Sequence, residues 1–187
     1  MFLLAFDTST PIVTVALVRD ETLVSDGSFG ELTGPQLHGE ELAALISDVM
    51  EGYEFAELDG LAVGTGPGPY TGLRVGLVTA EVIGHVHSLP VFGVSSLDAI
   101  ANGHRRHGAT GSITAVTDVK RKEHAIAAYA ESDHPIDGPR LVPASEYVLD
   151  GTPSAIDVAL VAIARAQRGE AQPVTPIYLR QPDVTLS

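Results

Sequence analysis

The sequence predicts an α/β fold in which helices pack on a mixed β-sheet, and three patterns indicate it. Short apolar and β-branched runs open the chain, an amphipathic helical pattern follows them, and a strand–helix–strand alternation comes next. The chain has 187 residues, which is the size of one domain or of two small ones that share a core.

The first predicted elements are strands. Residues 2–6 form a continuous apolar run and residues 12–18 a β-branched one, and the polar residues 7–11 separate them, which is typical of a hairpin. Residues 22–24 continue the pattern as a third strand. Because the first run does not alternate with polar residues, we expect its strand to be buried on both faces and central in the sheet.

The period then changes to that of a helix over about residues 36–51, with His38 at the edge of the apolar stripe. The stripe consists of Leu42, Leu45, Ile46, Val49 and Met50. A strand at 58–63, a Gly/Pro loop at 64–70, a helix at 71–87 and a strand at 91–94 follow. We expect the strand–helix–strand part to be a right-handed crossover.

A polar, glycine-containing segment at 102–111 divides the chain. Beyond it, residues 113–119 and 123–129 are predicted to form a second hairpin, residues 155–166 a helix, and the tail at 176–180 at most one short strand. We therefore expect an N-terminal subdomain of residues 1–103 and a smaller C-terminal subdomain of residues 104–187.

The composition argues against several classes of function. With 24 acidic and 11 basic residues the net charge is −13, so the field of the chain repels phosphate and autonomous RNA binding is not expected. The absence of cysteine removes disulfides, thiolate nucleophiles and zinc–cysteine sites. Neither a signal peptide nor a membrane helix is expected, so we expect a cytoplasmic protein.

The strongest local signal is a glycine-rich segment, residues 64–74, which leads from a predicted strand into a predicted helix. Backbone N–H groups at such a junction bind anions, so Gly66, Gly68 and Thr71 are candidate phosphate contacts. The segment lacks the lysine of a P-loop, however, and its two prolines supply no N–H group. A rigid loop with Thr71 as the helix cap explains the same residues.

Two polar clusters suggest metal chemistry and also have plainer interpretations. Asp7 follows the predicted central strand, where its carboxylate could position magnesium while the Thr8 hydroxyl contacts phosphate; an Asx-type turn would contain the same residues. His38 is followed by two glutamates, but ligands on one helix need a spacing of three or four, and position 42 is leucine. We expect no metal site.

Small residues recur every four positions in the predicted helix at 71–87. They are Gly72, Gly76, Ala80 and Gly84. Each glycine costs about 1 kcal/mol of helix stability relative to alanine, so the close approach of another backbone is expected to compensate. That backbone belongs either to the sheet of this chain or to a helix of another subunit.

Several segments, in this order, resemble the TsaB (YeaZ) family. They are residues 4–10, 38–40, 66–74, 95–97, 117–129 and 176–180. The resemblance covers the whole chain, and Thr-Gly-Leu-Arg at 71–74 is its most diagnostic part. It implies an actin-like (ASKHA, ribonuclease H-like) fold: a mixed sheet with flanking helices and a reduced second subdomain, because the stretch at 146–155 is shorter than the family pattern.

The resemblance also implies a function in making N6-threonylcarbamoyladenosine (t6A) in tRNA. Members of the family are noncatalytic dimerisation subunits that bind and support the transferase TsaD, with the ATPase TsaE in the larger complex, and they form homodimers when alone. The chain would then have no cofactor of its own, with ATP and magnesium in the assembled complex, and would contact tRNA only indirectly. The implied partner contacts are His38, Leu42, Leu45, Gly72, Gly76, Ala80 and Gly84.

Two other functions stay open. One is a small ATPase or phosphotransferase of the same superfamily, which would use Asp7 and the loop around Gly66 and Gly68. The other is a peptidase, for which the sequence offers neither a His-Glu-x-x-His pair nor a Gly-x-Ser-x-Gly elbow. The basic clusters at 105–106 and 120–122 are expected to be solvated turns rather than RNA contacts.

Overall fold

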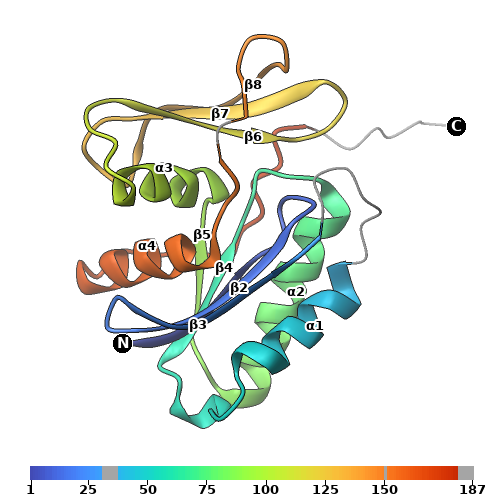
Figure 1. The fold of residues 1–187 in the computed structure, drawn as a ribbon, viewed down its shortest axis with the longest axis vertical. Helices are drawn as coiled ribbons and strands as arrows, with labels where there is room; N and C mark the ends of the chain where they lie inside the picture. Colours follow the sequence, from blue (N-terminus) through green and yellow to red (C-terminus); the bar gives the residue numbers. More distant parts are fainter. Residues whose placement is uncertain (31–37, 150, 181–187) are drawn as a thin grey trace, which may run out of the picture.

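The chain folds into two β-sheets with helices between and beside them (Figure 1). The structure is a computed structural model that describes residues 1–30, 38–149 and 151–180. The larger sheet has five strands in the order β3-β2-β1-β4-β5, and the smaller sheet has three in the order β6-β7-β8. The strands are β1 (Phe2–Asp7), β2 (Val13–Arg19), β3 (Thr22–Phe29), β4 (Gly60–Gly64), β5 (Val91–Val94), β6 (Ile113–Asp118), β7 (Glu123–Tyr129) and β8 (Pro135–Pro143).

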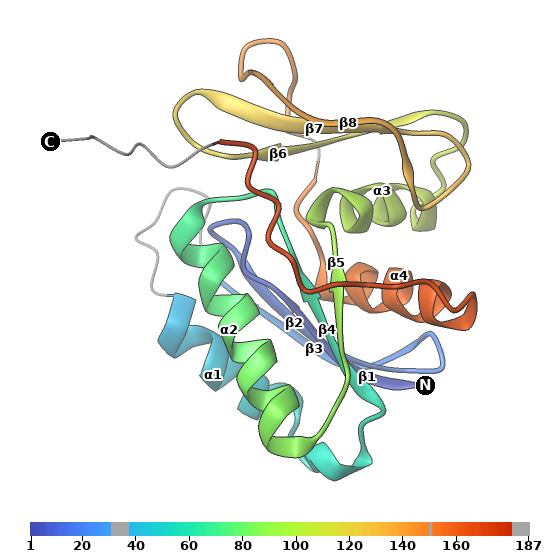
Figure 2. The same cartoon turned by 180° about the vertical axis from the view of Figure 1, so that it is seen from behind.

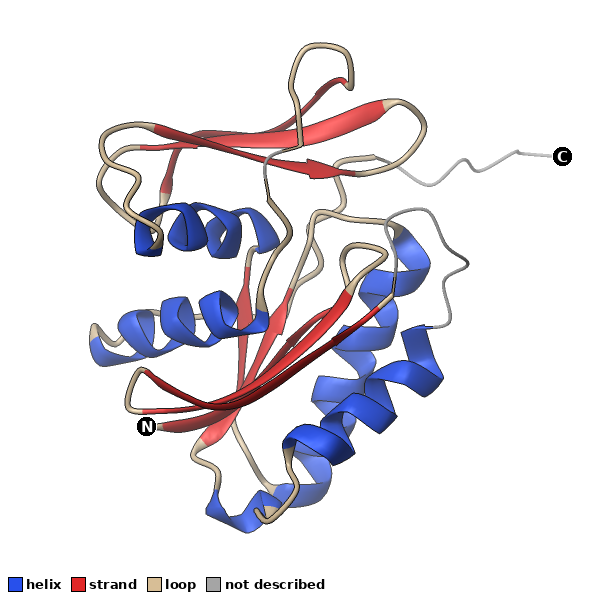
Figure 3. Ribbon diagram, in the orientation of Figure 1, coloured by secondary structure: helices blue, strands red, loops and turns tan. Residues whose placement is uncertain are grey.

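The helices form layers around these sheets. They are α1 (His38–Val49), α2 (Tyr70–His87), α3 (Ser96–Arg106) and α4 (Ala155–Gln167), with a short 3₁₀ turn, η1 (Phe55–Glu57). Helices α1 and α2 lie side by side on one face of the larger sheet, and α4 covers the other face (Figures 1 and 2). Helix α3 lies between α4 and the smaller sheet, so α4 and α3 together separate the two sheets (Figure 3).

Strand β1 is the centre of the larger sheet, as its unbroken apolar run predicted. It pairs antiparallel with β2 and parallel with β4, and all of its residues are buried. Because successive side chains of a strand point to opposite faces, Leu4 and Phe6 enter the core under α1 and α2, whereas Leu3 and Ala5 enter the core under α4. Strand β1 is therefore packed against helices on both faces of the sheet.

A buried polar cluster joins α3, α4 and the smaller sheet. Asp98 of α3 accepts hydrogen bonds from the Tyr129 hydroxyl at 2.6 Å and from the Arg165 guanidinium at 2.8 Å. Burial raises the pKa of Asp98 and also that of Tyr129, because both charged forms lose hydration. Since the three groups satisfy one another, the cluster fixes α3 against α4.

Two elements of the structure were not predicted from the sequence. Helix α3 spans Ser96–Arg106 and takes in the first part of the segment at 102–111, because Asn102 and Arg106 donate hydrogen bonds to Asp157 of α4. Strand β8 was not predicted, since its prolines and glycine are tolerated only in an edge strand. The described tail at 176–180 forms no strand, in agreement with the expectation of at most one short strand there.

The predicted boundary between subdomains, at residues 103 and 104, lies within α3. Helix α4 comes from the second half of the chain but packs on the larger sheet. The structure does not itself divide the chain at this point, and the division into residues 1–103 and 104–187 stays a prediction. None of the helices in the described part of the chain combines the length and the apolar character that crossing a bilayer requires.

Candidate functional site

The turn after β1 is a closed polar junction. One carboxylate oxygen of Asp7 accepts hydrogen bonds from the Ser9 backbone N–H at 2.7 Å and the Ser9 hydroxyl at 2.6 Å. The other oxygen accepts one from the Ser96 hydroxyl at 2.6 Å. Asp7 is fully buried, so both oxygens are engaged inside the protein, as in the Asx-type interpretation of this turn.

Thr8 connects this turn to α2. Its hydroxyl donates to the Gly72 carbonyl at 2.8 Å and accepts from the Gly76 N–H at 3.1 Å. A Cβ atom on Gly76 would collide with that hydroxyl. Glycine is therefore required at position 76 so that α2 can lie directly on the turn.

The glycine-rich loop packs against the same junction. The Gly66 N–H donates to the Ser96 hydroxyl at 3.2 Å, and a Cβ on Gly68 would meet the Ser9 backbone. The residue before α2 is Pro69, and no side chain caps the helix, so the prediction of Thr71 as the cap was wrong. Thr71 is exposed in the first turn of α2.

This junction does not fit magnesium and a nucleotide phosphate. The Asp7 oxygens already accept three hydrogen bonds, the Gly66 N–H is engaged, and the two prolines of the loop carry no donor. The described residues also contain no group of three His, Asp or Glu side chains that could hold a metal ion. The arrangement can fix the loop and α2 to the sheet, which is a structural task.

Helix α2 has two unlike long faces. The face with Gly72, Gly76, Ala80 and Gly84 is buried against the larger sheet and its loops. Of the two interpretations that the sequence left open, the structure therefore supports packing on the chain's own sheet. All four residues are buried within this chain, and their role as partner contacts stays a prediction.

The opposite face of α2 carries an exposed apolar stripe, which we call the valine stripe. It consists of Val78, Val82 and Val86, which are 55%, 54% and 66% exposed. Their spacing of four residues places them on one side of the helix. Sequence reasoning missed these residues, although the same spacing that revealed the small face also implies a face opposite to it.

The predicted contacts on α1 divide between core and surface. Leu42 is buried in the core beneath the helices, and Leu45 is half-buried and packs against the same core. Both side chains belong to the apolar stripe that faces the sheet, and their role as partner contacts stays a prediction. His38 begins α1, but its side chain lies outside the described residues.

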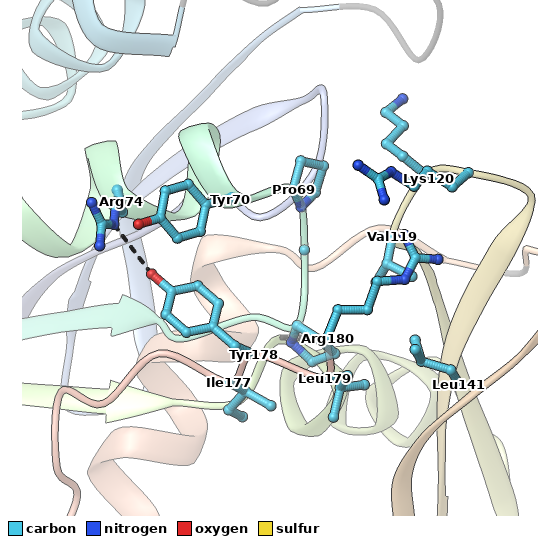
Figure 4. Close-up of a pocket in the computed structure, with 13 residues that line it drawn as sticks. Pro69, Tyr70, Arg74, Val119, Lys120, Leu141, Ile177, Tyr178, Leu179 and Arg180 are labelled. Carbon is cyan, nitrogen blue, oxygen red and sulfur yellow. Dashed lines mark hydrogen bonds between the residues drawn. The ribbon is translucent and has the colours of Figure 1, made fainter. Parts of the chain in front are cut away.

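A pocket of about 630 Å³ lies where the start of α2, the β6–β7 turn and the C-terminal stretch meet (Figure 4). We call it the cationic pocket, because Arg74, Lys120, Arg121 and Arg180 line it. As a charged group, the sequence analysis considered only the basic turn at 120–122 among these residues; Arg74 and Arg180 lie far from it in the chain.

Two tyrosines form one side of the cationic pocket. The Tyr70 and Tyr178 rings lie 5.2 Å apart between centroids, and the Arg74 guanidinium lies 4.1 Å from the centre of the Tyr70 ring. Arg74 also donates a hydrogen bond to the Tyr178 hydroxyl at 3.3 Å, which raises the pKa of Arg74 above its usual range. The guanidinium therefore stays charged.

A family model described as tRNA N6-adenosine threonylcarbamoyltransferase (TsaD) matches residues 34–177. An uncharacterized protein of Mycobacterium tuberculosis is 34% identical over 204 residues, which cover 96% of this chain and 92% of that protein.

The tRNA threonylcarbamoyladenosine biosynthesis protein TsaB of Escherichia coli is 33% identical over 139 residues, which cover 73% of this chain and 58% of that protein. The solved structure of YeaZ from Pseudomonas aeruginosa superimposes with a TM-score of 0.82 at 21% identity, covering 95% of this chain and 99% of that one. The predicted fold class is confirmed.

Proposed function

Because the chain belongs to the TsaB (YeaZ) family, we propose that it is a noncatalytic subunit in t6A biosynthesis. Its task is to bind a TsaD-type transferase through the valine stripe of α2. The observation that carries this proposal is the exposure of three aligned valines on a helix whose other face is fully used within the chain.

The energetics favour docking at this face. Fully burying an exposed valine side chain is worth about 1.5–3 kcal/mol, so covering three valines that are more than half exposed contributes a few kcal/mol. An aligned apolar stripe on a helix is also the usual surface for pairing with another helix. Exposed single hydrophobic residues need no explanation, but a contiguous stripe indicates an interface.

The noncatalytic role is supported by how the polar groups are used. The carboxylate of Asp7 and the hydroxyl of Thr8 make internal hydrogen bonds, so these two groups hold the fold together rather than serving phosphate transfer. We therefore do not favour the ATPase alternative. In a two-fold dimer the same surface of both copies meets at the axis. The valine stripe would therefore join two copies of this chain when TsaD is absent. TsaE and tRNA would join the assembled complex.

The test is a charge placed in the middle of the valine stripe. Val82→Glu should abolish association with the TsaD-type protein of the same organism, because complex formation would bury an unpaired carboxylate. Association is measured by light scattering after size-exclusion chromatography of the mixed proteins. The matched control is Val148→Glu, since Val148 is 84% exposed in the segment between β8 and α4.

Retained association of Val148→Glu together with loss for Val82→Glu supports the proposal. Equal association of both variants with TsaD would exclude the valine stripe as the docking face. Turnover of ATP by the purified chain alone would contradict the noncatalytic role. An unfolding scan of each variant checks that the fold is intact. Both variants should unfold like the parent chain, because both side chains are exposed.

A further inference from the structure

The two edges of the larger sheet differ in what lies beside them. At one edge is β5, whose Gly93 N–H donates a hydrogen bond to the Gln172 carbonyl at 3.0 Å, so the C-terminal stretch covers this edge. At the other edge is β3. Within the described residues, the hydrogen bonds of β3 run to β2 alone. Because alternate residues of an antiparallel edge strand direct their N–H and C=O groups away from the sheet, β3 presents unpaired backbone groups to another strand.

Strand β8, at an edge of the smaller sheet, is protected against such pairing. It contains three prolines, and its Asp137 and Arg140 form an ion pair at 3.4 Å. Prolines and charged side chains are usual means of keeping a further strand away. Strand β3 has no proline, and its only charged residue is Asp26. A β-bulge at Val24 interrupts its register, which leaves residues 25–29 as a regular open edge.

Exposed apolar side chains lie along β3. Leu23, Val24 and Phe29 are 41%, 36% and 53% exposed. In a sheet, β-branched and aromatic side chains stabilise the pairing of neighbouring strands by contacts across the pair. A segment that pairs with β3 would therefore cover apolar surface as well as backbone groups, provided that it carries such side chains itself.

The charge around this edge indicates the kind of segment that fits it. Between Arg19 and Arg74 the sequence contains neither Lys nor Arg. Asp26 of β3 and Asp48 of the neighbouring helix α1 are both exposed. Antiparallel pairing of β3 with β3 of a second copy would bring like charges together, which is unfavourable. A basic segment is instead attracted to the acidic edge.

We propose that β3 is a docking edge for an extended, basic segment of another polypeptide, which adds to the five-stranded sheet as a further strand. Main-chain hydrogen bonds to residues 25–29 supply the binding. Lys or Arg side chains near Asp26 supply the preference for a basic segment, and an apolar side chain of the segment contacts Phe29. This edge belongs to a different element from the valine stripe of α2, so the inference does not depend on how TsaD binds.

The test uses a fluorescent peptide of alternating lysine and valine, titrated with the purified chain at low ionic strength and followed by anisotropy. Asp26→Lys should weaken binding of this peptide at least about tenfold, which corresponds to about 1.4 kcal/mol. The substitution replaces attraction by repulsion and adds a lysine, which protects an edge against pairing. The matched control is Asp137→Lys, which makes the same charge change in the protected edge strand β8. It should weaken binding less than about threefold, because only screened, long-range attraction changes.

Two further measurements separate strand addition from attraction between charges alone. A peptide of alternating lysine and proline has the same charge but lacks half of the backbone N–H groups, so it should not bind. The lysine–valine peptide should slow amide hydrogen exchange in β3 of the unsubstituted chain and leave exchange in β8 unchanged. No binding of the lysine–valine peptide, equal binding of both peptides, equal effects of the two substitutions, or protection that excludes β3 would each overturn the proposal.

Discussion

The two long faces of α2 use the same four-residue spacing for opposite purposes. The inward face lacks side chains at Gly72, Gly76 and Gly84, so the helix axis comes close to the sheet and Thr8 reaches the helix backbone. The outward face carries valines that contact little within the chain. A smooth helix face thus serves close internal packing, whereas the surface available for another protein is the one that has side chains.

The largest expected change in the free energy of unfolding comes from adding one methyl group to the inward face of α2. Gly76→Ala should lower the free energy of unfolding by about 2–3 kcal/mol, because the new Cβ collides with the Thr8 hydroxyl and disturbs the hydrogen bond from the Gly76 N–H. Denaturant unfolding followed by circular dichroism measures the change.

The control for this substitution is Gly39→Ala in α1, where a Cβ would meet nothing within 4 Å. Alanine is a better helix former than glycine, so this variant should be as stable as the parent chain or more stable. If Gly76→Ala were also stabilising, α2 would not rest on the Thr8 turn as described.

A smaller effect is expected from the other partner of the same contact. Thr8→Val keeps the shape of the side chain but removes the hydroxyl, so the Gly76 N–H and the Gly72 carbonyl lose their side-chain partner. The free energy of unfolding should fall by about 1–2 kcal/mol. Thr71→Val, at an exposed position of α2, should change it by less than about 0.5 kcal/mol. Similar losses in both variants would show that the Thr8 hydroxyl does not tie α2 to the turn.

Local patterns sufficed to predict most of the fold. The apolar run of β1, the period of α1 and the crossover through α2 are signals within one element, and the structure has these elements close to their predicted bounds. Helix α3 and the edge strand β8 were not predicted in this way. Contacts with Asp157 hold the former, and pairing with β7 forms the latter.

The candidate site was harder to predict, because its members are distant in the sequence. Arg74, Lys120 and Arg180 lie on α2, the β6–β7 turn and the C-terminal stretch, and no spacing rule connects them. For Gly76 the sequence predicted the close approach of another backbone, whereas the group that approaches is a side-chain hydroxyl. Only the register of α2 over the turn decided that this group is Thr8 of the same chain.

The smallest expected change in the free energy of unfolding is at the outward face of α2. Its sign distinguishes the two faces, because a substitution there should stabilise the chain. Val78→Ala removes an exposed side chain and improves helix propensity by a few tenths of a kcal/mol, so about 0.5 kcal/mol is the upper limit of stabilisation of the free chain. The same change should weaken association with the TsaD-type protein, because less apolar area is covered. Unfolding at low protein concentration and titration calorimetry with the partner measure the two effects separately. A loss of chain stability above about 1 kcal/mol would mean that Val78 packs within the chain, and the outward face would then be as internal as the inward one.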